Sequence, residues 1–201
     1  MKFNTKIAVA AFFAIGLSAY AQEGFIRPEV SYALPNNSYQ YIGSFKGAAA
    51  FNLAGGCVFG AQDEQEVSLS IGTTTFKVSN PSVEYFDGAQ VSLKLEETPI
   101  LINYRYYTGA KSDSARFYVG ASAGILLAKL TATSDGATVT SASSNPWDLG
   151  LGLGGAFKLA DKIDLDVGYR FLLSGNALAN AYYSSASLRA SYFYAGVGFK
   201  F

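Results

Sequence analysis

The chain has 201 residues, half of them hydrophobic, and its 15 basic and 15 acidic side chains leave no net charge. A neutral chain lacks the concentrated basic surface that nucleic acid binding requires, so no nucleic acid partner is expected. The sequence contains no histidine and one cysteine, which excludes histidine-based catalytic triads, histidine-ligated metals and an internal disulfide. We therefore expect no catalysis and no cofactor.

The N-terminus has the pattern of a secretory signal peptide. Two lysines precede an apolar run over residues 7–17, which is too short to span a bilayer. Residues 19–21, Ala-Tyr-Ala, match the small-x-small site of signal peptidase. The pattern predicts cleavage after Ala21, which separates a signal peptide (residues 1–21) from one mature domain (residues 22–201). No later segment has about 18 consecutive apolar residues, so no transmembrane helix is expected.

From residue 24 onward, apolar residues alternate with polar or small ones at a period of two, which is typical of β-strands and excludes amphipathic helices. The first half of the chain contains four such segments, at residues 24–34, 48–60, 65–73 and 98–107. The second half contains four more, at residues 116–129, 146–157, 163–171 and 192–201. Most match the length that a tilted strand needs to cross a bilayer, about 9–11 residues.

The connections between these segments alternate in length. Those at residues 61–64, 108–115 and 160–162 are short, whereas those at residues 35–47, 74–90, 131–145 and 174–185 are long. Short periplasmic turns and long extracellular loops are typical of outer-membrane barrels, and an even strand number places both termini in the periplasm. We therefore predict an all-β fold, an eight-stranded antiparallel transmembrane β-barrel with up-and-down topology and four extracellular loops.

One segment breaks the alternation in phase. Leu93 and Leu95 are apolar at odd positions, whereas Ile100 and Ile102 are apolar at even positions. A slip of one residue turns every side chain to the other face, and proline is tolerated at bulges. We therefore predict a β-bulge near Pro99, with the part before it standing above the membrane.

The charged residues indicate which face meets lipid, because a lipid-facing Lys or Arg at the midplane costs about 2–4 kcal/mol. The apolar faces must point outward, so the charges point into the lumen. Strand direction places eight of them in its periplasmic half: Arg27, Glu29, Glu66, Arg105, Arg116, Asp164, Asp166 and Lys200. Unpaired buried charges are costly, so we expect four cations and four anions to pair as a plug without a wide pore. Above them only Asp148 and Arg170 remain, and we expect a small hydrated vestibule there.

Two motifs have more than one interpretation. Residues 150–155 match the dinucleotide pattern G-x-G-x-x-G, but they lie inside an alternating segment, and we interpret them as lumen-facing glycines. Asp161, Asp164 and Asp166 have the oxygen ligands of a Ca²⁺ site, yet nearby cations favour pairing instead.

Residues 165–170, Leu-Asp-Val-Gly-Tyr-Arg, and residues 194–201, Tyr-Ala-Gly-Val-Gly-Phe-Lys-Phe, resemble the last two strands of the OmpA-like and OmpX-like outer-membrane β-barrel family, which includes porin-like opacity proteins. The resemblance implies an outer-membrane location, contact with outer-membrane lipid, and a C-terminal signal read by the barrel-assembly machinery. Val197, Phe199 and Phe201 form the apolar face of that signal.

The same family includes adhesins, small channels and structural proteins. We first expect a structural or surface-interaction role, with a possible surface ligand bound through the four extracellular loops. A narrow porin-like channel for small solutes is the alternative, and a lipid-modifying barrel enzyme is a third.

Overall fold

A computed structural model describes residues 23–36, 38–39, 43–79, 91–110, 112–134, 137–177 and 186–201. The expected signal peptide and its cleavage site after Ala21 lie outside these residues. Within them, no helix is long and apolar enough to cross a membrane.

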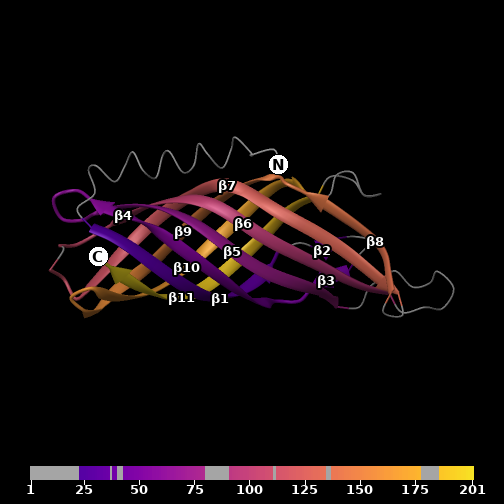
Figure 1. Ribbon diagram of the computed structural model, residues 1–201, viewed down its shortest axis with the longest axis horizontal. Coiled ribbons are helices and arrows are strands. Elements are labelled where there is room, and N and C mark those ends of the chain that lie inside the picture. The colour runs from indigo at the N-terminus through magenta and orange to yellow at the C-terminus, as the bar shows by residue number, and fades with distance from the viewer. Residues whose placement is uncertain are drawn as a thin grey trace.

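Eight long strands form a closed antiparallel barrel (Figure 1). In chain order they are β1 (Glu23–Pro35), β4 (Ala48–Phe59), β5 (Gln65–Ser79), β6 (Val91–Tyr107), β7 (Ala115–Ser134), β9 (Trp147–Ala160), β10 (Ile163–Ala177) and β11 (Ala186–Lys200). Each pairs with its neighbours in the chain, and β1 pairs with β11 to close the sheet. The predicted eight-stranded up-and-down barrel is thus confirmed.

Three short strands extend one end of the barrel: β2 (Ser38–Tyr39), β3 (Gly43–Phe45) and β8 (Ala137–Ser144). β2 pairs with β3, β3 with β5, and β8 with β7. β8 also continues the line of β9, since both pair with β7 on either side of Pro146. Residues 131–145, predicted as a loop, are therefore mostly a β-hairpin. Their Thr, Ser and Ala residues carry no apolar alternation, which is why the pattern missed it.

The described ends of the chain meet at the other end of the barrel. Gly24 donates a backbone hydrogen bond to the carbonyl of Phe201 (3.1 Å), and Phe201 donates one back to Gly24 (2.9 Å). The turns at residues 60–64, 108–114 and 161–162 lie at this same end, near the C label in Figure 1. Short turns and the described ends of the chain therefore share one side, the periplasmic side of the barrel.

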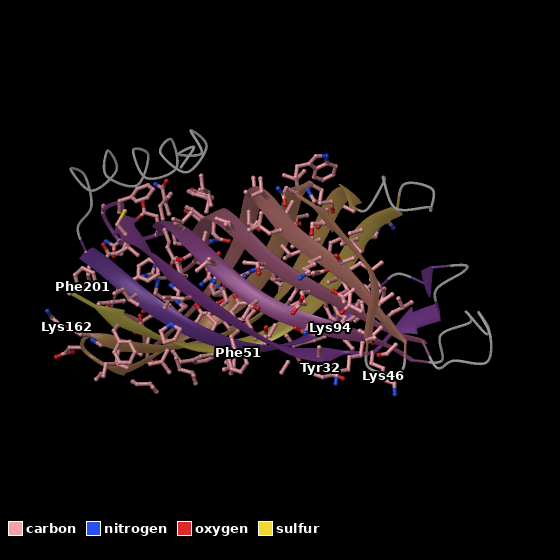
Figure 2. All side chains as sticks on the ribbon, turned by 45° about the vertical axis from the view of Figure 1, so that its right-hand side comes forward. Tyr32, Lys46, Phe51, Lys94, Lys162 and Phe201 are labelled. Atoms are coloured by element: carbon pink, nitrogen blue, oxygen red, sulfur yellow. The ribbon has the colours of Figure 1, made fainter. Side chains whose placement is uncertain are left out.

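An apolar belt surrounds the barrel wall (Figure 2). Its side chains point away from the lumen, and Phe51, Val119 and Leu151 remain 60%, 62% and 69% exposed. Tyr32 and Trp147 add aromatic rings toward the extracellular ends of their strands. A surface of this composition matches the hydrocarbon of a bilayer with an aromatic girdle at its edge. The belt is therefore the lipid-facing surface.

The bulge predicted near Pro99 is wrong. β6, which the structure describes throughout, pairs with β7 in a single register over its whole length. Its pairing with β5 stops at Ile100 and resumes at Glu97 in the same register. The gap arises because proline has no N–H to donate.

The apolar residues of β6 move from even to odd positions because the medium outside the strand changes along its length. Odd residues of β6 point inward from Leu93 to Tyr107, so Leu93 and Leu95 lie inside the barrel. Toward the extracellular end the outward positions are polar, as Lys94 and Glu96 show. The outer face passes from lipid into water there, and the apolar side chains move from the outside of the wall to its interior.

Candidate functional site

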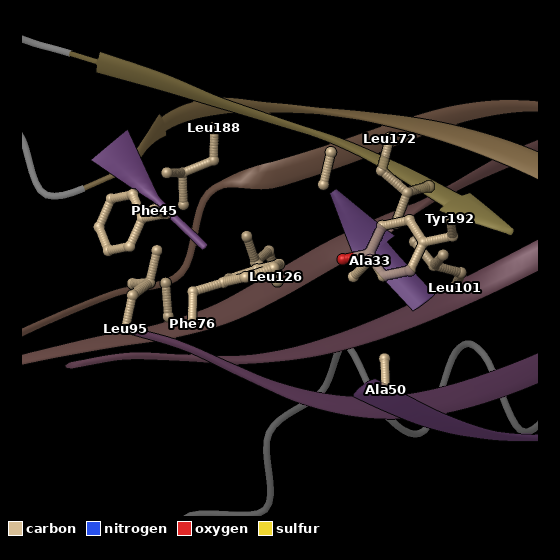
Figure 3. Packing of buried hydrophobic residues seen from close by; sticks show 12 residues of the cluster. Ala33, Phe45, Ala50, Phe76, Leu95, Leu101, Leu126, Leu172, Leu188 and Tyr192 are labelled. Carbon is tan, nitrogen blue, oxygen red and sulfur yellow. The ribbon is translucent and has the colours of Figure 1, made fainter. Parts of the chain in front are cut away.

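The extracellular half of the lumen is filled by apolar side chains (Figure 3). They come from β1, β3, β4, β5, β6, β7, β10 and β11: Ala33, Phe45, Ala50, Phe76, Leu95, Leu101, Leu126, Ala128, Leu172, Leu188, Ala190 and Tyr192. We call this set the outer core. The expected hydrated vestibule is therefore wrong, because the upper strand ends stand in water and bury their apolar residues inward.

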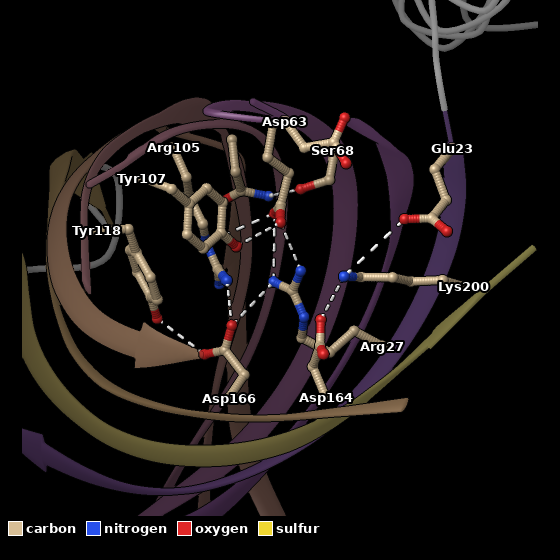
Figure 4. Close-up of polar contacts among 12 residues, drawn as sticks. Glu23, Arg27, Asp63, Ser68, Arg105, Tyr107, Tyr118, Asp164, Asp166 and Lys200 are labelled. Carbon is tan, nitrogen blue, oxygen red and sulfur yellow. Dashed lines mark hydrogen bonds and ion pairs between the residues drawn. The ribbon is translucent and has the colours of Figure 1, made fainter. Parts of the chain in front are cut away.

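The periplasmic half of the lumen holds a network of ion pairs (Figure 4). Arg27 contacts both carboxylate oxygens of Glu66, at 2.6 and 3.2 Å, and lies 3.3 Å from Asp166. Arg105 lies 2.6 Å from Asp166 and 3.4 Å from Glu29. All five side chains are at most 5% exposed. We call them the lumen network.

Tyrosine hydroxyls complete the network. Tyr107 donates to Glu66 Oε2 at 2.7 Å, and Tyr118 donates to Asp166 Oδ1 at 2.8 Å. The guanidinium of Arg105 lies 4.5 Å from the ring centre of Tyr118, a cation–π distance. The sequence placed Tyr118 on the lumen face, but the partner of a side chain across a barrel depends on closure and is invisible in the pattern.

Arg170 joins the same network instead of standing above it. Its Nη2 lies 3.4 Å from Glu29 Oε2, which also accepts a hydrogen bond from Asn52 at 2.8 Å. Three arginines thus face three carboxylates. Charge balance is what allows such groups to stay ionised out of water.

The other predicted lumen charges lie nearer the periplasmic rim. Lys200 Nζ is 2.6 Å from Asp164 and 3.9 Å from Glu23. Arg116 instead donates to the backbone carbonyl of Asp63 at 2.7 Å, and it forms no ion pair with a carboxylate in the described part of the chain. The eight predicted residues therefore fall into three groups. Five form the buried network, Lys200 and Asp164 form a pair at the rim, and Arg116 binds a backbone carbonyl instead of a carboxylate.

A cavity of about 400 Å³ lies between the rim and the network. Turn residues such as Gln62 and Asp113 line its mouth, and Arg27, Glu66 and Asp166 line its inner end. The cavity therefore faces the periplasm and ends at the lumen network.

Lumen-facing glycines leave room for these side chains. A Cβ atom on Gly168 would lie 2.7 Å from the hydroxyl of Tyr194 and 2.8 Å from that of Tyr118. Residues 150–155 lie inside β9, which leads through a turn into β10. Without a following helix, this G-x-G-x-x-G run is not a dinucleotide site.

The aspartates considered for Ca²⁺ are each paired with a cation. Asp161 lies 3.0 Å from Lys158, while Asp164 and Asp166 take part in the pairs above. No group of three potential metal-ligating side chains occurs among the described residues. The arrangement favours ion pairing over metal binding.

Val197, Phe199 and Phe201 lie at the end of β11 and just beyond it. Phe199 and Phe201 are well exposed on the outer face. A Cβ atom on Gly24 would come within 2.7 Å of the Phe201 ring, so the last side chain lies over the first strand. The aromatic end of the chain thus covers the seam between β1 and β11.

The chain matches solved structures over most of its length. It is 17% identical to the Neisserial surface protein A (NspA), with a TM-score of 0.61, covering 89% of this chain and 97% of that one. It is 15% identical to Ail, the attachment invasion locus protein of Yersinia pestis, with a TM-score of 0.52 and coverage of 89% and 98%. A major outer membrane protein from Thermus thermophilus gives 11% identity, a TM-score of 0.54 and coverage of 89% and 99%.

No protein-family model and no curated protein sequence matches the chain. The structural matches nevertheless share one architecture, the eight-stranded barrel of outer-membrane proteins. The apolar belt and the polar periplasmic half of the lumen are what that architecture requires. The chain thus has the fold of eight-stranded outer-membrane β-barrels, with the apolar belt of a barrel that spans a bilayer.

Proposed function

We propose that this barrel has a structural or surface-interaction role and neither transports solutes nor catalyses a reaction. The observation that carries the proposal is that the lumen is filled in both halves. The lumen network occupies the periplasmic half, and the outer core occupies the extracellular half. A solute would have to break a balanced set of buried ion pairs and then cross a packed apolar segment, and both steps are costly.

Conductance measurement tests the closed lumen. Pure mature protein in a planar bilayer should show no steady current. The double variant L95S/L101S, which places hydroxyls in the outer core, should also stay closed, because the lumen network is intact. A large and steady current through the wild-type barrel would overturn the proposal in favour of a channel.

The extracellular extension offers a surface for a partner. Lys77 and Lys94 lie directly opposite each other on β5 and β6, and like charges in that position destabilise a sheet. Lys46 and Lys129 are also exposed on this extension, where Glu96 is the acid that pairs with Lys94. A surface with this charge suits an anionic ligand. Ail has been crystallised with the heparin analogue sucrose octasulfate, and we propose an anionic glycan as the ligand class here.

Calorimetric titration with sucrose octasulfate tests the ligand class. The variant K77Q/K94Q should bind roughly tenfold more weakly, since each exposed charge contact contributes up to about 1 kcal/mol. The matched control is K158Q/K162Q, which removes two exposed lysines at the periplasmic end and should bind as the wild type does. Equal affinity in all three proteins would remove this ligand class.

We also propose that residues 1–21 are removed on export and that residues 22–201 form one barrel domain. The charged and apolar parts of the leader, and the Ala-Tyr-Ala site, support this. N-terminal sequencing of protein taken from outer membranes should begin at Gln22. A start at Met1 or at a distant residue would contradict it.

A further inference from the structure

Two acidic side chains lie buried in the lumen outside the ion pairs described above. Glu97 points inward from β6 and is 5% exposed, and Asp148 points inward from β9 and is 1% exposed. Neither belongs to the lumen network, and they share the extracellular half of the lumen with the outer core.

Each carboxyl group has one neutral hydrogen-bond donor. Tyr192 donates its hydroxyl to Glu97 Oε2 at 3.4 Å, and Ser174 donates to Asp148 Oδ1 at 3.0 Å. The second oxygen of Asp148, Oδ2, is buried and has no hydrogen-bond partner among the described residues. A carboxylate left in this state keeps most of its desolvation cost.

The titratable or charged groups acting on the pair are Tyr192 of β11 and Arg170 of β10. Arg170 contacts Glu29, and in the described part of the chain it forms no ion pair with Asp148 or Glu97. The inward residues around the pair on β1, β4, β5 and β7 are alanine, leucine, phenylalanine and threonine. No contacting cation among the described residues therefore balances the two acids.

Two carboxylates in such surroundings need a proton or a metal ion. A buried ionised carboxyl without a partner costs several kcal/mol, and such a group takes up a proton instead. Ca²⁺ needs about six to eight oxygen ligands. The two carboxyl groups supply at most four of these oxygens, so the ligand number favours the proton.

We propose that Glu97 and Asp148 form a proton-binding site, in which both carboxyl groups keep their protons in the folded barrel at mildly acidic pH, where the unfolded chain has lost them, and their ionisation loosens the outer core. Protonation supplies an O–H to each carboxyl group and removes both charges from an apolar interior. The outer core is then stable only while the protons stay bound.

The sign of the pH dependence follows from proton counting. In the unfolded chain both acids ionise above about pH 4, whereas the folded barrel keeps their protons. The contribution of these two acids to stability is therefore greatest at mildly acidic pH and falls as the pH rises, by up to about tenfold in the unfolding equilibrium per pH unit for each retained proton. The fall ends at the pH where the pair ionises inside the folded barrel.

Infrared spectroscopy of the mature protein in liposomes tests the site directly. A protonated carboxyl group has a C=O stretch well separated from carboxylate bands. At about pH 5.5, where exposed acids are mostly ionised, the wild type should show this band, and E97Q and D148N should each lose part of it. The matched control is E96Q, which removes an exposed acid from the neighbouring position of β6 and should leave the band unchanged.

Urea unfolding across pH supplies a second readout that does not depend on one variant folding well. The fall in stability with rising pH should be weaker in E97Q and D148N than in the wild type and unchanged in E96Q. Absence of the protonated band at about pH 5.5 overturns the proposal. So does a wild-type barrel that loses stability in EDTA and regains it with Ca²⁺, because the acids would then hold a metal.

Discussion

At the scale of single residues, the lumen is organised by pairing. Arg27 and Arg105 reach across from β1 and β6 to carboxylates of other strands, so each arginine joins strands far apart in the sequence. A balanced set of this kind is no more stabilising than a well-packed apolar one, but it is costly to break on one side. The charges therefore specify how the strands assemble around the lumen.

Removal of one partner should show this cost. The variant E66Q keeps the shape of the side chain but leaves Arg27 without its closest carboxylate. We expect a loss of about 3–5 kcal/mol in the free energy of unfolding. Urea unfolding can be followed by the fluorescence of Trp147, the only tryptophan of the chain.

The control for that experiment is D161N. Asp161 also forms an ion pair, with Lys158, but it is fully exposed at the periplasmic turn. Its loss should leave stability unchanged, since exposed pairs contribute little. Equal effects of E66Q and D161N would contradict the interpretation.

The close approach of glycines to the tyrosines gives a second test. G168A would force a methyl group against two tyrosine hydroxyls and the backbone of Leu153, and we expect a loss of about 1–3 kcal/mol. G198A is the matched lumen-facing control, because the nearest atom to its Cβ would be 3.7 Å away. Urea unfolding of both variants should separate them, and equal stability would contradict the crowding argument.

At the scale of elements, the strands show how far an alternating pattern reaches. Within the membrane span, apolar side chains face lipid and polar side chains face the lumen. The alternation therefore identified the lipid-facing side of the predicted strands. Above the membrane the period of two continues in β6, but water now meets the outer face. Alternation separates two faces without saying which one is inside, so Leu93 and Leu95 suggested a bulge although both lie inside the barrel.

The end of β11 carries a prediction of its own. We expect F201A to lower the amount of barrel in the outer membrane severalfold, because the terminal aromatic residue is the proposed assembly signal. The side chain is 70% exposed, so the purified barrel should lose at most about 1 kcal/mol of stability. F193A, on the same face of the same strand, should leave the membrane level unchanged. Quantitative immunoblots of outer-membrane fractions check this, and equal losses in both variants would argue against a signal.

At the scale of the whole molecule, the sequence pattern predicts the barrel architecture but not the side-chain contacts that fill its lumen. Strand number, topology and lipid faces follow from local alternation and loop length. Arg170 and Glu97 acquire their partners only when distant strands come together, so their roles depend on closure and register. Of the extension above the membrane, only the part of β6 before Pro99 was predicted; the short strands β2, β3 and β8 were missed, since their mostly polar residues look like loops.

We predict that the part of the barrel within the membrane can form without the tip of the extracellular extension. Replacing residues 132–140 of the β7–β8 hairpin by Asn-Gly joins the paired residues Thr131 and Ser141 by a two-residue turn and should leave a barrel that still inserts, because the removed residues lie above the apolar belt. Electrophoresis without heating, which distinguishes the compact barrel from the unfolded chain, measures this. Failure of the shortened chain to insert would show that the outer core is needed for closure.

The two hydrogen bonds between Gly24 and Phe201 have a consequence for how the protein is made. They join residues separated by almost the whole chain, so contact order is high and folding is correspondingly slow. The sheet cannot close until β11 has reached β1. Until then the apolar strand faces are exposed to water and prone to aggregation, so we expect the chain to need protection from aggregation before it inserts.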